Sequence, residues 1–413
     1  MAHDRVRNSR GRKGFVLVTL MVSLVVLLAF LGLSVDVGYM EYQKTRMQTA
    51  ADAAALGGVQ EIKLAGSATA VAAAKTDAAL NGFTDGRNSA SVSVANPPSS
   101  GYYTSDSTAV EVMISQSVST YFMRLVGSPT ITVRARAVAR RGAGTNCLYA
   151  LEPTASGAFS ASGGINVQVG CGVVVNSSSG TAMSVSGGAT VAATSFGVVG
   201  DYSISGGSMV TPTPIAHVAS ETDPLSYVPA PTVGSCDHTN YSVSGGATAV
   251  ANPGVYCKGI SISGGSRLTF NPGTYILKGG GFSVSGGSTA TGAGVTFYNT
   301  AAAGNPYAPI SISGGTTISL SAPTTGPLAA MLFFQDRSIV SASANSISGG
   351  ASTVLNGALY FSTSPVTYSG GTAGTYTIIV ARNVSFSGGS ALNANYTSLP
   401  GGSPIKGGAA LSE

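Results

Sequence analysis

Residues 241–265 read YSVSGGATAVANPGVYCKGISISGG, and the pattern in this stretch decides the fold. It contains two copies of an apolar–Ser–apolar–Ser–Gly–Gly unit, which begin at Tyr241 and Ile260. Alternation with a period of two is typical of a strand that buries one face. A pair of glycines then permits a bend with positive φ, which other residues adopt only at a cost. Each unit therefore predicts one short strand followed by one tight turn.

The Ser-Gly-Gly tripeptide recurs ten times in the C-terminal two-thirds of the chain. The copies start at Ser162, Ser186, Ser205, Ser244, Ser263, Ser285, Ser313, Ser348, Ser369 and Ser387. The shorter spacings between successive copies are about 19 residues, and repeat periods in this range indicate a stacked architecture. The second apolar position of the unit is filled in every copy, and the first fails only at Asn345.

These features predict a mainly β chain whose C-terminal domain, residues 145–408, is a parallel β-helix or solenoid. Each coil would place its strand about 4.8 Å above the last, which buries an apolar ladder and exposes a serine ladder. A disordered Gly/Ser-rich tail is the alternative. The regular placement of Ile, Val, Tyr and Phe, with a mean hydropathy of +0.29, argues against disorder.

An apolar segment at residues 15–35 predicts a single transmembrane helix. It has 21 residues without a charge and would be about 31 Å long as a helix, which matches the hydrocarbon core of a bilayer. Five basic residues and one acid precede it. The positive-inside rule therefore places the basic tail, residues 1–14, in the cytoplasm, and we expect everything after Asp36 in the periplasm or outside the cell.

Two other fates of this segment stay open. The sequence Lys13-Gly14-Phe15 resembles a prepilin peptidase site, so cleavage between Gly14 and Phe15 is a possible processing step, although Thr19 stands where most such pilins carry Glu. A cleaved signal peptide is the second alternative. The apolar run is long for a signal peptide and has no clear A-x-A site at its end, which favours an uncleaved anchor.

After the anchor, residues 36–82 predict an alanine-rich helical stalk, interrupted or bent at Gly57, Gly58 and Gly66. Residues 88–141 alternate as strands do and predict a small β-rich segment. The small side chains of the stalk would let another helix approach closely. We therefore interpret the stalk as a docking or oligomerisation element, with an ordinary packed helix as the alternative.

The anchor and stalk together resemble a known family. An apolar anchor that ends in Val35-Asp36-Val37-Gly38, followed by RMQTAADAAAL at residues 46–56, is similar to the N-terminal region of TadG-like Flp (Tad) pilus-assembly proteins. The specific part is Asp36, Gln48, Ala50, Ala51, Asp52, Ala53, Ala54, Ala55 and Leu56. The resemblance covers about residues 10–141. It implies a role in pilus assembly and other assembly proteins as partners.

Charge and cysteine content narrow the function further. Residues 145–413 carry 6 basic and 7 acidic residues, so a nucleic-acid groove is not expected there. The cysteines lack metal-ligand spacing, which argues against zinc. In an oxidising compartment the simplest pairing is Cys147 with Cys171 and Cys236 with Cys257, and free buried thiols are the alternative.

Catalytic residues, cofactors and metal sites are not predicted. His238 lies near Cys236, as a Cys–His nucleophile would require, but we interpret this segment as a loop between coils with a disulfide. Glu221 and Asp223 lie in the Pro-rich excursion 211–231, which we interpret as a solvated loop and not as a cation site. We expect a non-enzymatic envelope component of pilus assembly that displays the solenoid. The alternatives are an adhesin whose serine ladder contacts surface carbohydrate and a carbohydrate-active β-helix enzyme.

Overall fold

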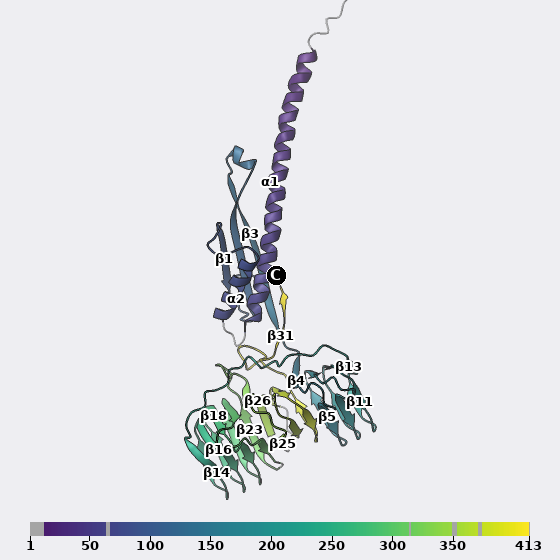
Figure 1. The fold of residues 1–413 in the computed structure, drawn as a ribbon, viewed down its shortest axis with the longest axis vertical. Coiled ribbons are helices and arrows are strands. Elements are labelled where there is room, and N and C mark those ends of the chain that lie inside the picture. The colour runs from purple at the N-terminus through teal and green to yellow at the C-terminus, as the bar shows by residue number, and fades with distance from the viewer. Residues whose placement is uncertain (1–11, 63–66, 314, 349–352, 371–373, 413) are drawn as a thin grey trace, which may run out of the picture. The chain divides into compact units, whose positions relative to one another are not determined.

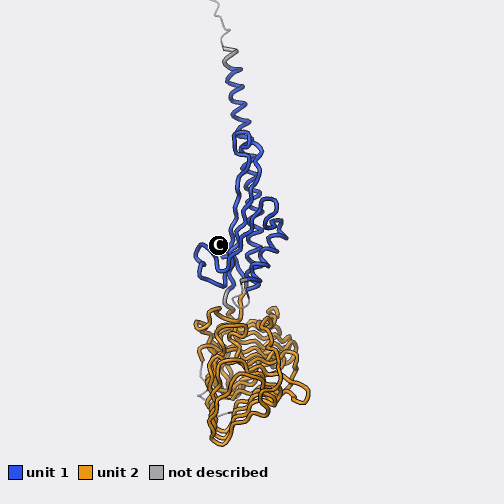
Figure 2. The backbone as a smooth tube through the Cα atoms, turned by 90° about the vertical axis from the view of Figure 1, so that its left-hand side faces the viewer, with its two compact units in different colours: residues 1–142, 408–413 blue, residues 143–407 orange. Residues whose placement is uncertain are grey.

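A computed structural model describes residues 12–62, 67–313, 315–348, 353–370 and 374–412. The chain divides into two compact units, residues 1–142 with 408–413 and residues 143–407 (Figure 2). The second unit is therefore inserted into the first, because the last strand of the chain belongs to the first unit's sheet. The basic tail expected in the cytoplasm lies mostly outside the described residues.

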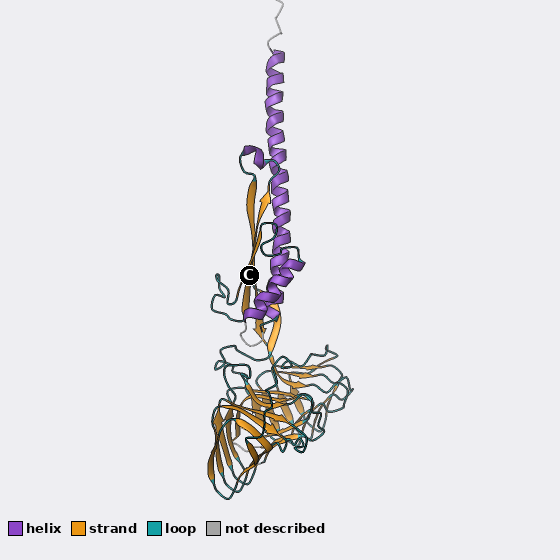
Figure 3. Cartoon of the chain, turned by 60° about the vertical axis from the view of Figure 1, so that its left-hand side comes forward, coloured by secondary structure: helices purple, strands orange, loops and turns teal. Residues whose placement is uncertain are grey.

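The first unit is built on one long helix. Helix α1 (Arg12–Gln60) has 49 residues, so the predicted anchor and the first part of the stalk form one continuous helix (Figure 3). It is long and apolar enough to cross a membrane. Helix α2 (Ser67–Leu80) packs against its end.

The expected interruption of the helix comes after Gly57 and Gly58, because α1 runs through both glycines to Gln60 and α2 begins at Ser67. Gly66, the third glycine expected to interrupt it, lies outside the described residues. A Cβ built on Gly58 would lie 3.0 Å from Ala74 Cβ, and one on Gly57 would collide with Asp77. The missing side chains therefore let α2 approach closely instead of bending α1.

A four-stranded sheet lies along α1. Its order is β1 (Ala90–Ala95), β2 (Ala109–Ser119), β3 (Thr130–Ala143) and β31 (Lys406–Leu411). The β1–β2 and β2–β3 pairs are antiparallel. A short 3-10 helix η1 (Met123–Val126) forms the end of the β2–β3 hairpin.

The second unit is a parallel β-helix of about 11 turns. Strands of its first face stack in the order β14 (His238–Val243), β16 (Gly254–Ile262), β18 (Gly273–Lys278), β21 (Val295–Thr300), β24 (Met331–Gln335), β26 (Thr353–Phe361), β28 (Thr377–Ala381), β4 (Asn146–Ala150), β7 (Gly172–Val175), β10 (Ser195–Val198) and β13 (Ile215–Ala216).

Two further faces complete each coil. The second face continues from β14 and β16 through β19 (Phe282–Val284), β22 (Ile310–Ile312), β25 (Asn345–Ser348), β27 (Val366–Ser369), β29 (Val384–Phe386), β5 (Phe159–Ser162), β8 (Met183–Ser186) and β11 (Tyr202–Ile204). The third contains β15 (Thr248–Ala251), β17 (Arg267–Phe270), β20 (Thr289–Ala293), β23 (Thr317–Ser321), part of β26, then β30 (Ser390–Leu392), β6 (Asn166–Val169), β9 (Thr190–Ala192) and β12 (Met209–Thr211).

The coils do not stack in chain order, which corrects the expectation that each coil lies above the last. The first coil, at β4, pairs with the last one, at β28, so the chain enters and leaves near the middle of the stack. Figure 1 shows β14 and β11 toward opposite ends, with β4 and β5 between them. The first coils build outward to β13, and the chain then crosses to β14 and builds back.

Residues 217–237 make this crossing and are called the strap. They include most of the Pro-rich excursion 211–231 expected to be a solvated loop, but Leu225 and Val228 are buried in the solenoid core. Along the strap, the Glu221 carboxylate accepts from the Tyr149 hydroxyl at 3.1 Å, and the Lys278 ammonium donates to the Gly234 carbonyl at 3.1 Å. The strap is therefore fastened to several coils along the stack.

Arg337 connects the strap to the coils through three hydrogen bonds. Its guanidinium donates to the Leu225 and Val228 carbonyls at 2.8 and 3.0 Å, and to the Tyr360 hydroxyl at 2.6 Å. Tyr360 in turn donates to Asp223 at 2.5 Å. Burial, with the nearby Asp223 carboxylate, raises the pKa of Tyr360 to about 12, so its hydroxyl stays protonated and keeps donating.

Replacing Arg337 with methionine should release the strap while leaving the coils folded. The change leaves two carbonyls without this donor and costs about 2 kcal/mol of local stability. We expect proteolytic cleavage within residues 217–237 to become about 30-fold faster, since cleavage tracks the population of the open form. Arg267→Met, at an exposed position on β17, is the matched control. Equal cleavage rates in both variants would contradict the fastening role.

Candidate functional site

The face of α1 that carries the resemblance is buried inside the first unit. Met47, Ala50, Ala51, Ala54, Ala55 and Val59 are fully buried against α2 and the sheet, and Asp52, Ala53 and Leu56 are half-buried. Alanine at these positions permits close contact between α1 and the strands. The alanine-rich face interpreted as a docking element for other proteins is thus largely used within this chain.

Gln48 fixes the register between α1 and β3. Its side-chain amide donates to the Arg136 carbonyl at 2.9 Å and to the Asp52 carboxylate at 2.8 Å. The two residues lie one turn apart on the helix, so Asp52 orients the amide toward the strand. This explains why a glutamine and an aspartate stand among the alanines.

Asp36 closes the end of the β2–β3 hairpin. Its carboxylate is buried and accepts from the backbone N–H groups of Tyr121, Phe122 and Met123 at 2.7, 2.9 and 2.6 Å. A carboxylate is suited to this position because it offers two oxygens to several donors at once. The first charged residue after the apolar segment therefore holds a hairpin more than 80 residues away in sequence.

Replacing Asp36 with alanine should loosen the end of the hairpin. Three backbone donors lose a charged acceptor, and we expect a local cost of about 2 kcal/mol. Hydrogen exchange at residues 121–123 should then be about 30-fold faster than in the wild type. Asp36→Asn, which retains one carbonyl acceptor, should have an intermediate effect. Unchanged exchange in the alanine variant would rule out the capping role.

A second buried carboxylate connects the two central strands of the sheet, β2 and β3, with the loop between β1 and β2. Glu111, on β2, accepts from the Ser99 hydroxyl, from the Ser100 hydroxyl at 2.8 Å, and from the Arg136 guanidinium on β3. Burial raises the pKa of Glu111, but the hydrogen bonds from Ser99, Arg136 and Ser100 outweigh it and hold the pKa at about 2. Sequence reasoning missed this cluster, because a single Glu in an alternating strand reads as an outward residue.

Gly14 and Phe15, the candidate processing residues, lie in the first turns of α1. The helix begins at Arg12, so the Gly14–Phe15 bond lies within a helix. Whether it is cleaved stays a prediction.

Two models of known protein families match the N-terminal part of the chain. The model of the TadE/G-like Flp pilus-assembly family matches residues 14–61, and the model of a Tad-like Flp pilus-assembly domain matches residues 49–139. The N-terminal region therefore matches the Tad pilus-assembly family. Searches of curated proteins and of solved structures found no match.

Both matches coincide with the first unit. The Tad region, residues 14–139, contains α1, α2 and the β1–β2–β3 sheet, together with Asp36, Gln48 and the buried alanines. Both matches end before the solenoid, whose function has to be considered from its own residues.

The solenoid presents one regular surface feature, an unbroken ladder of hydroxyl groups on its second face. Register pairs connect Ser242, Ser261, Ser283, Ser311, Ser346, Thr367, Ser385, Ser160, Ser184 and Ser203 in that order. All ten are half-buried or exposed. At one strand spacing per step the ladder is about 43 Å long.

The glycine pairs beside this hydroxyl ladder also stack. Gly206 and Gly286 have positive φ, and a Cβ on either would lie 2.9 or 3.0 Å from the backbone nitrogen of the glycine one coil away. Only glycine therefore satisfies both the turn and the coil-to-coil contact. The hydroxyl ladder is held at a fixed spacing by this turn.

The other candidate site residues from the sequence, the four cysteines and His238, lie in the solenoid and contribute to its packing. The structure pairs Cys147 with Cys171 and Cys236 with Cys257, each across two neighbouring coils. His238 stacks on Tyr256, and because Cys236 is in a disulfide it offers no thiolate. Within the residues that the structure describes, no three His, Cys, Asp or Glu side chains gather as a metal site would require.

Proposed function

We propose that this chain is a non-enzymatic, membrane-anchored component of Flp pilus assembly that displays a β-solenoid on the periplasmic side of the inner membrane. The supporting observation is that the Tad region includes one continuous helix, α1, whose apolar part is long enough to span a bilayer. The excess of basic residues before Phe15 supports a cytoplasmic N-terminus.

The division of the chain into two units supports the proposal that one unit anchors the protein and the other, the solenoid, is displayed. The solenoid is an insertion whose two ends lie together, with the Gly144 N–H donating to the Ile405 carbonyl at 2.9 Å. The Tad region would anchor the protein and contact other assembly proteins, and the solenoid would provide a rigid, hydroxyl-rich surface. We divide the chain into a basic tail at 1–14, an anchor at 15–35, a stalk at 36–82, a β-rich segment at 88–141 and the solenoid at 145–408.

Gene deletion with complementation tests this function. We expect cells without the chain to lose pili, and the full chain to restore them. A second variant joins Gly144 to Ile405 directly and so removes the solenoid while keeping β31 for the sheet. Normal piliation in the deletion strain would contradict the assembly role.

A second candidate function is adhesion to a surface carbohydrate, which the continuous hydroxyl ladder favours. Under this reading, the variant without the solenoid restores pili but not attachment. Arginine at Ser242 and Ser311, the two exposed members of the ladder, should then abolish attachment, whereas Thr269→Arg on the third face should not. A carbohydrate-active enzyme has less support, because Glu152 pairs with Arg382, and Glu221 and Asp223 fasten the strap.

The fate of the N-terminus is tested by mass spectrometry of membrane and sheared-pilus fractions. We expect the intact N-terminal sequence in the membrane fraction. A chain that begins at Phe15 in the pilus fraction would instead support processing and incorporation into the fibre.

A further inference from the structure

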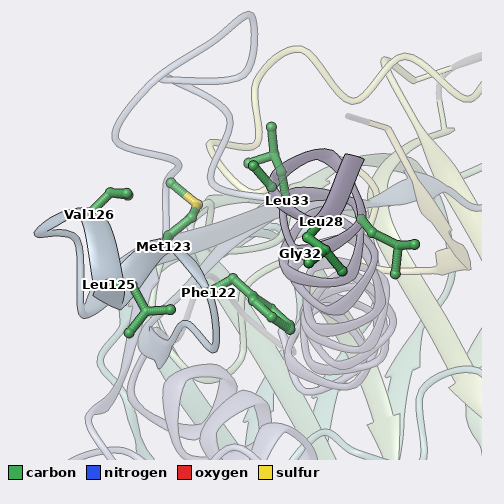
Figure 4. Close-up of a pocket in the computed structure, with 9 residues that line it drawn as sticks. Leu28, Gly32, Leu33, Phe122, Met123, Leu125 and Val126 are labelled. Atoms are coloured by element: carbon green, nitrogen blue, oxygen red, sulfur yellow. The ribbon is translucent and has the colours of Figure 1, made fainter. Parts of the chain in front are cut away.

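The end of the β2–β3 hairpin lies beside the apolar part of α1. We call residues 120–129 the hairpin tip. The Phe122 ring packs on Gly32, where a Cβ would lie 2.6 Å from the ring carbon Cδ1 (Figure 4). Gly32 is four residues before Asp36, and so within the segment that the proposed function places in the membrane.

The contact between Phe122 and Gly32 determines how far the hairpin tip lies along α1, and so how deep it lies in a bilayer that α1 spans. An apolar groove of about 570 Å³ separates the helix from the tip and is lined by Leu28, Ala29, Leu31, Gly32, Leu33, Phe122, Met123, Leu125 and Val126. At about 1.5 Å per residue, Gly32 and Leu28 lie about 6 and 12 Å along the helix from Asp36. One leaflet's hydrocarbon is about 15 Å thick, so a helix that spans the bilayer carries the tip into it.

The hairpin tip has exposed apolar side chains and internal backbone hydrogen bonds, as a segment in an apolar environment would need. Leu125 and Val126 are 80% and 82% exposed, which is unusual for large apolar residues in the folded part of a protein. Backbone donors must be satisfied internally in lipid. Asp36 accepts from residues 121–123, Leu125 N–H donates to Phe122, and Ser128 N–H donates to Met123.

The residues around Asp36 match a membrane interface. Tyr39 and Tyr121 stack edge to face with their ring centroids 5.4 Å apart, and Tyr42 is 58% exposed. Tyrosines concentrate at the level of the lipid headgroups. Arg124, the charged residue of the tip, is exposed, and its long side chain can extend to a lipid phosphate while its stem stays in the apolar layer.

We propose that the hairpin tip inserts into the membrane leaflet nearer to Asp36, where phospholipid acyl chains fill the groove between the tip and α1. The proposal rests on the proposed membrane anchor. It adds a second attachment point, which would hold the Tad region against the bilayer and restrict its rotation about the helix axis. Acyl chains are favoured over a partner protein because the helix wall of the groove is part of the apolar span itself.

Tryptophan fluorescence tests the insertion, since the chain has no native tryptophan. Three single variants of the full chain are reconstituted in phosphatidylethanolamine–phosphatidylglycerol vesicles: Leu125→Trp in the tip, Val25→Trp in the middle of the anchor, and Tyr102→Trp in a loop of the same unit. Tyr102 is 85% exposed, so that variant reports the water-exposed reference. Val126→Trp repeats the tip measurement at a neighbouring position. Circular dichroism confirms that each variant is folded.

Lipids brominated near the headgroup end of the acyl chain should quench the fluorescence of the Leu125→Trp variant at least about two-fold, with a blue-shifted emission. The Val25→Trp variant should respond most to bromine near the chain end, and the Tyr102→Trp variant to neither. A quenched anchor with an unquenched, red-shifted tip overturns the insertion and leaves the anchor standing. A blue-shifted tip that bromine does not quench means that a protein covers it, which also overturns the proposal. An unquenched anchor overturns both.

Discussion

Replacing Glu111 with glutamine is expected to destabilise the Tad region by about 3 kcal/mol at pH 7. Neutralising the buried carboxylate of this hydrogen-bonded ion pair removes the charge that faces Arg136 and leaves the two serine hydroxyls with a weaker acceptor. Urea unfolding of the full chain in detergent would measure the loss, with Met113→Trp on β2 as the reporter in both proteins.

The effect of Glu111 should depend on pH with a defined sign. The pKa of about 2 in the folded state lies below the usual value near 4.5. Its stabilising contribution is therefore complete above about pH 4.5 and is lost as the pH falls toward 2. The wild type and Glu111→Gln should converge in stability at low pH.

An exposed ion pair of the same unit provides the control. Lys75 and Asp85 pair at 2.8 Å, but both side chains are more than 40% exposed. Lys75→Met should cost less than about 1 kcal/mol. If both substitutions cost the same, or if the Glu111→Gln deficit persists unchanged at pH 2, the buried pair does not stabilise the sheet as we infer.

The repeat made the solenoid predictable from sequence. The apolar–Ser–apolar–Ser–Gly–Gly unit specifies inward side chains, outward hydroxyls and a glycine turn, and each is a local property of six residues. The exception at Asn345 has a structural reason that the six residues do not contain, because its buried amide accepts from Ile310 N–H at 2.9 Å and donates to the Ser364 hydroxyl at 2.8 Å. The side-chain amide replaces an apolar residue without leaving its hydrogen bonds unmade.

The order of the coils was not predictable in the same way. Every coil presents nearly the same edge, so the repeat does not say which coil lies next to which. The order is determined by the strap, whose buried Leu225 and Val228 look like ordinary residues of a Pro-rich loop, and by the return of β31 to the first sheet. These are single long-range contacts, and a periodic pattern carries no information about them.

In the Tad region, the sequence identified the important residues but not their contacts. The resemblance identified Asp36, Gln48 and the alanines, but composition alone did not show what they contact. Asp36 binds the backbone of a segment 85 residues away, and Gln48 binds a carbonyl 88 residues away. Backbone partners leave no mark in the sequence, so only the folded chain shows that these residues join α1 to the hairpin.

Within the solenoid, the largest stability loss is expected from Phe297→Ala. Phe297 is fully buried, and its ring stacks between Tyr275 and Phe333 with centroids 5.3 Å from each. Phe270 and Phe282 contact the same ring at 5.0 and 4.9 Å. Truncation would remove these contacts and leave a cavity that three neighbouring coils cannot close, because their backbones are held by ladder hydrogen bonds. The expected cost is about 3–5 kcal/mol.

Coils of a solenoid depend on their neighbours, so the Phe297 cavity should lower the unfolding midpoint of the whole stack rather than open one coil. Urea unfolding with Val250→Trp, on an exposed position of β15, would follow this in the full chain. Val340→Ala, at a site that is 70% exposed, should change stability by less than about 0.5 kcal/mol. Phe297→Leu, which keeps much of the volume, should fall between the two. A Phe297→Ala protein as stable as the Val340→Ala control would show that the stacked aromatic rings do not hold the coils together.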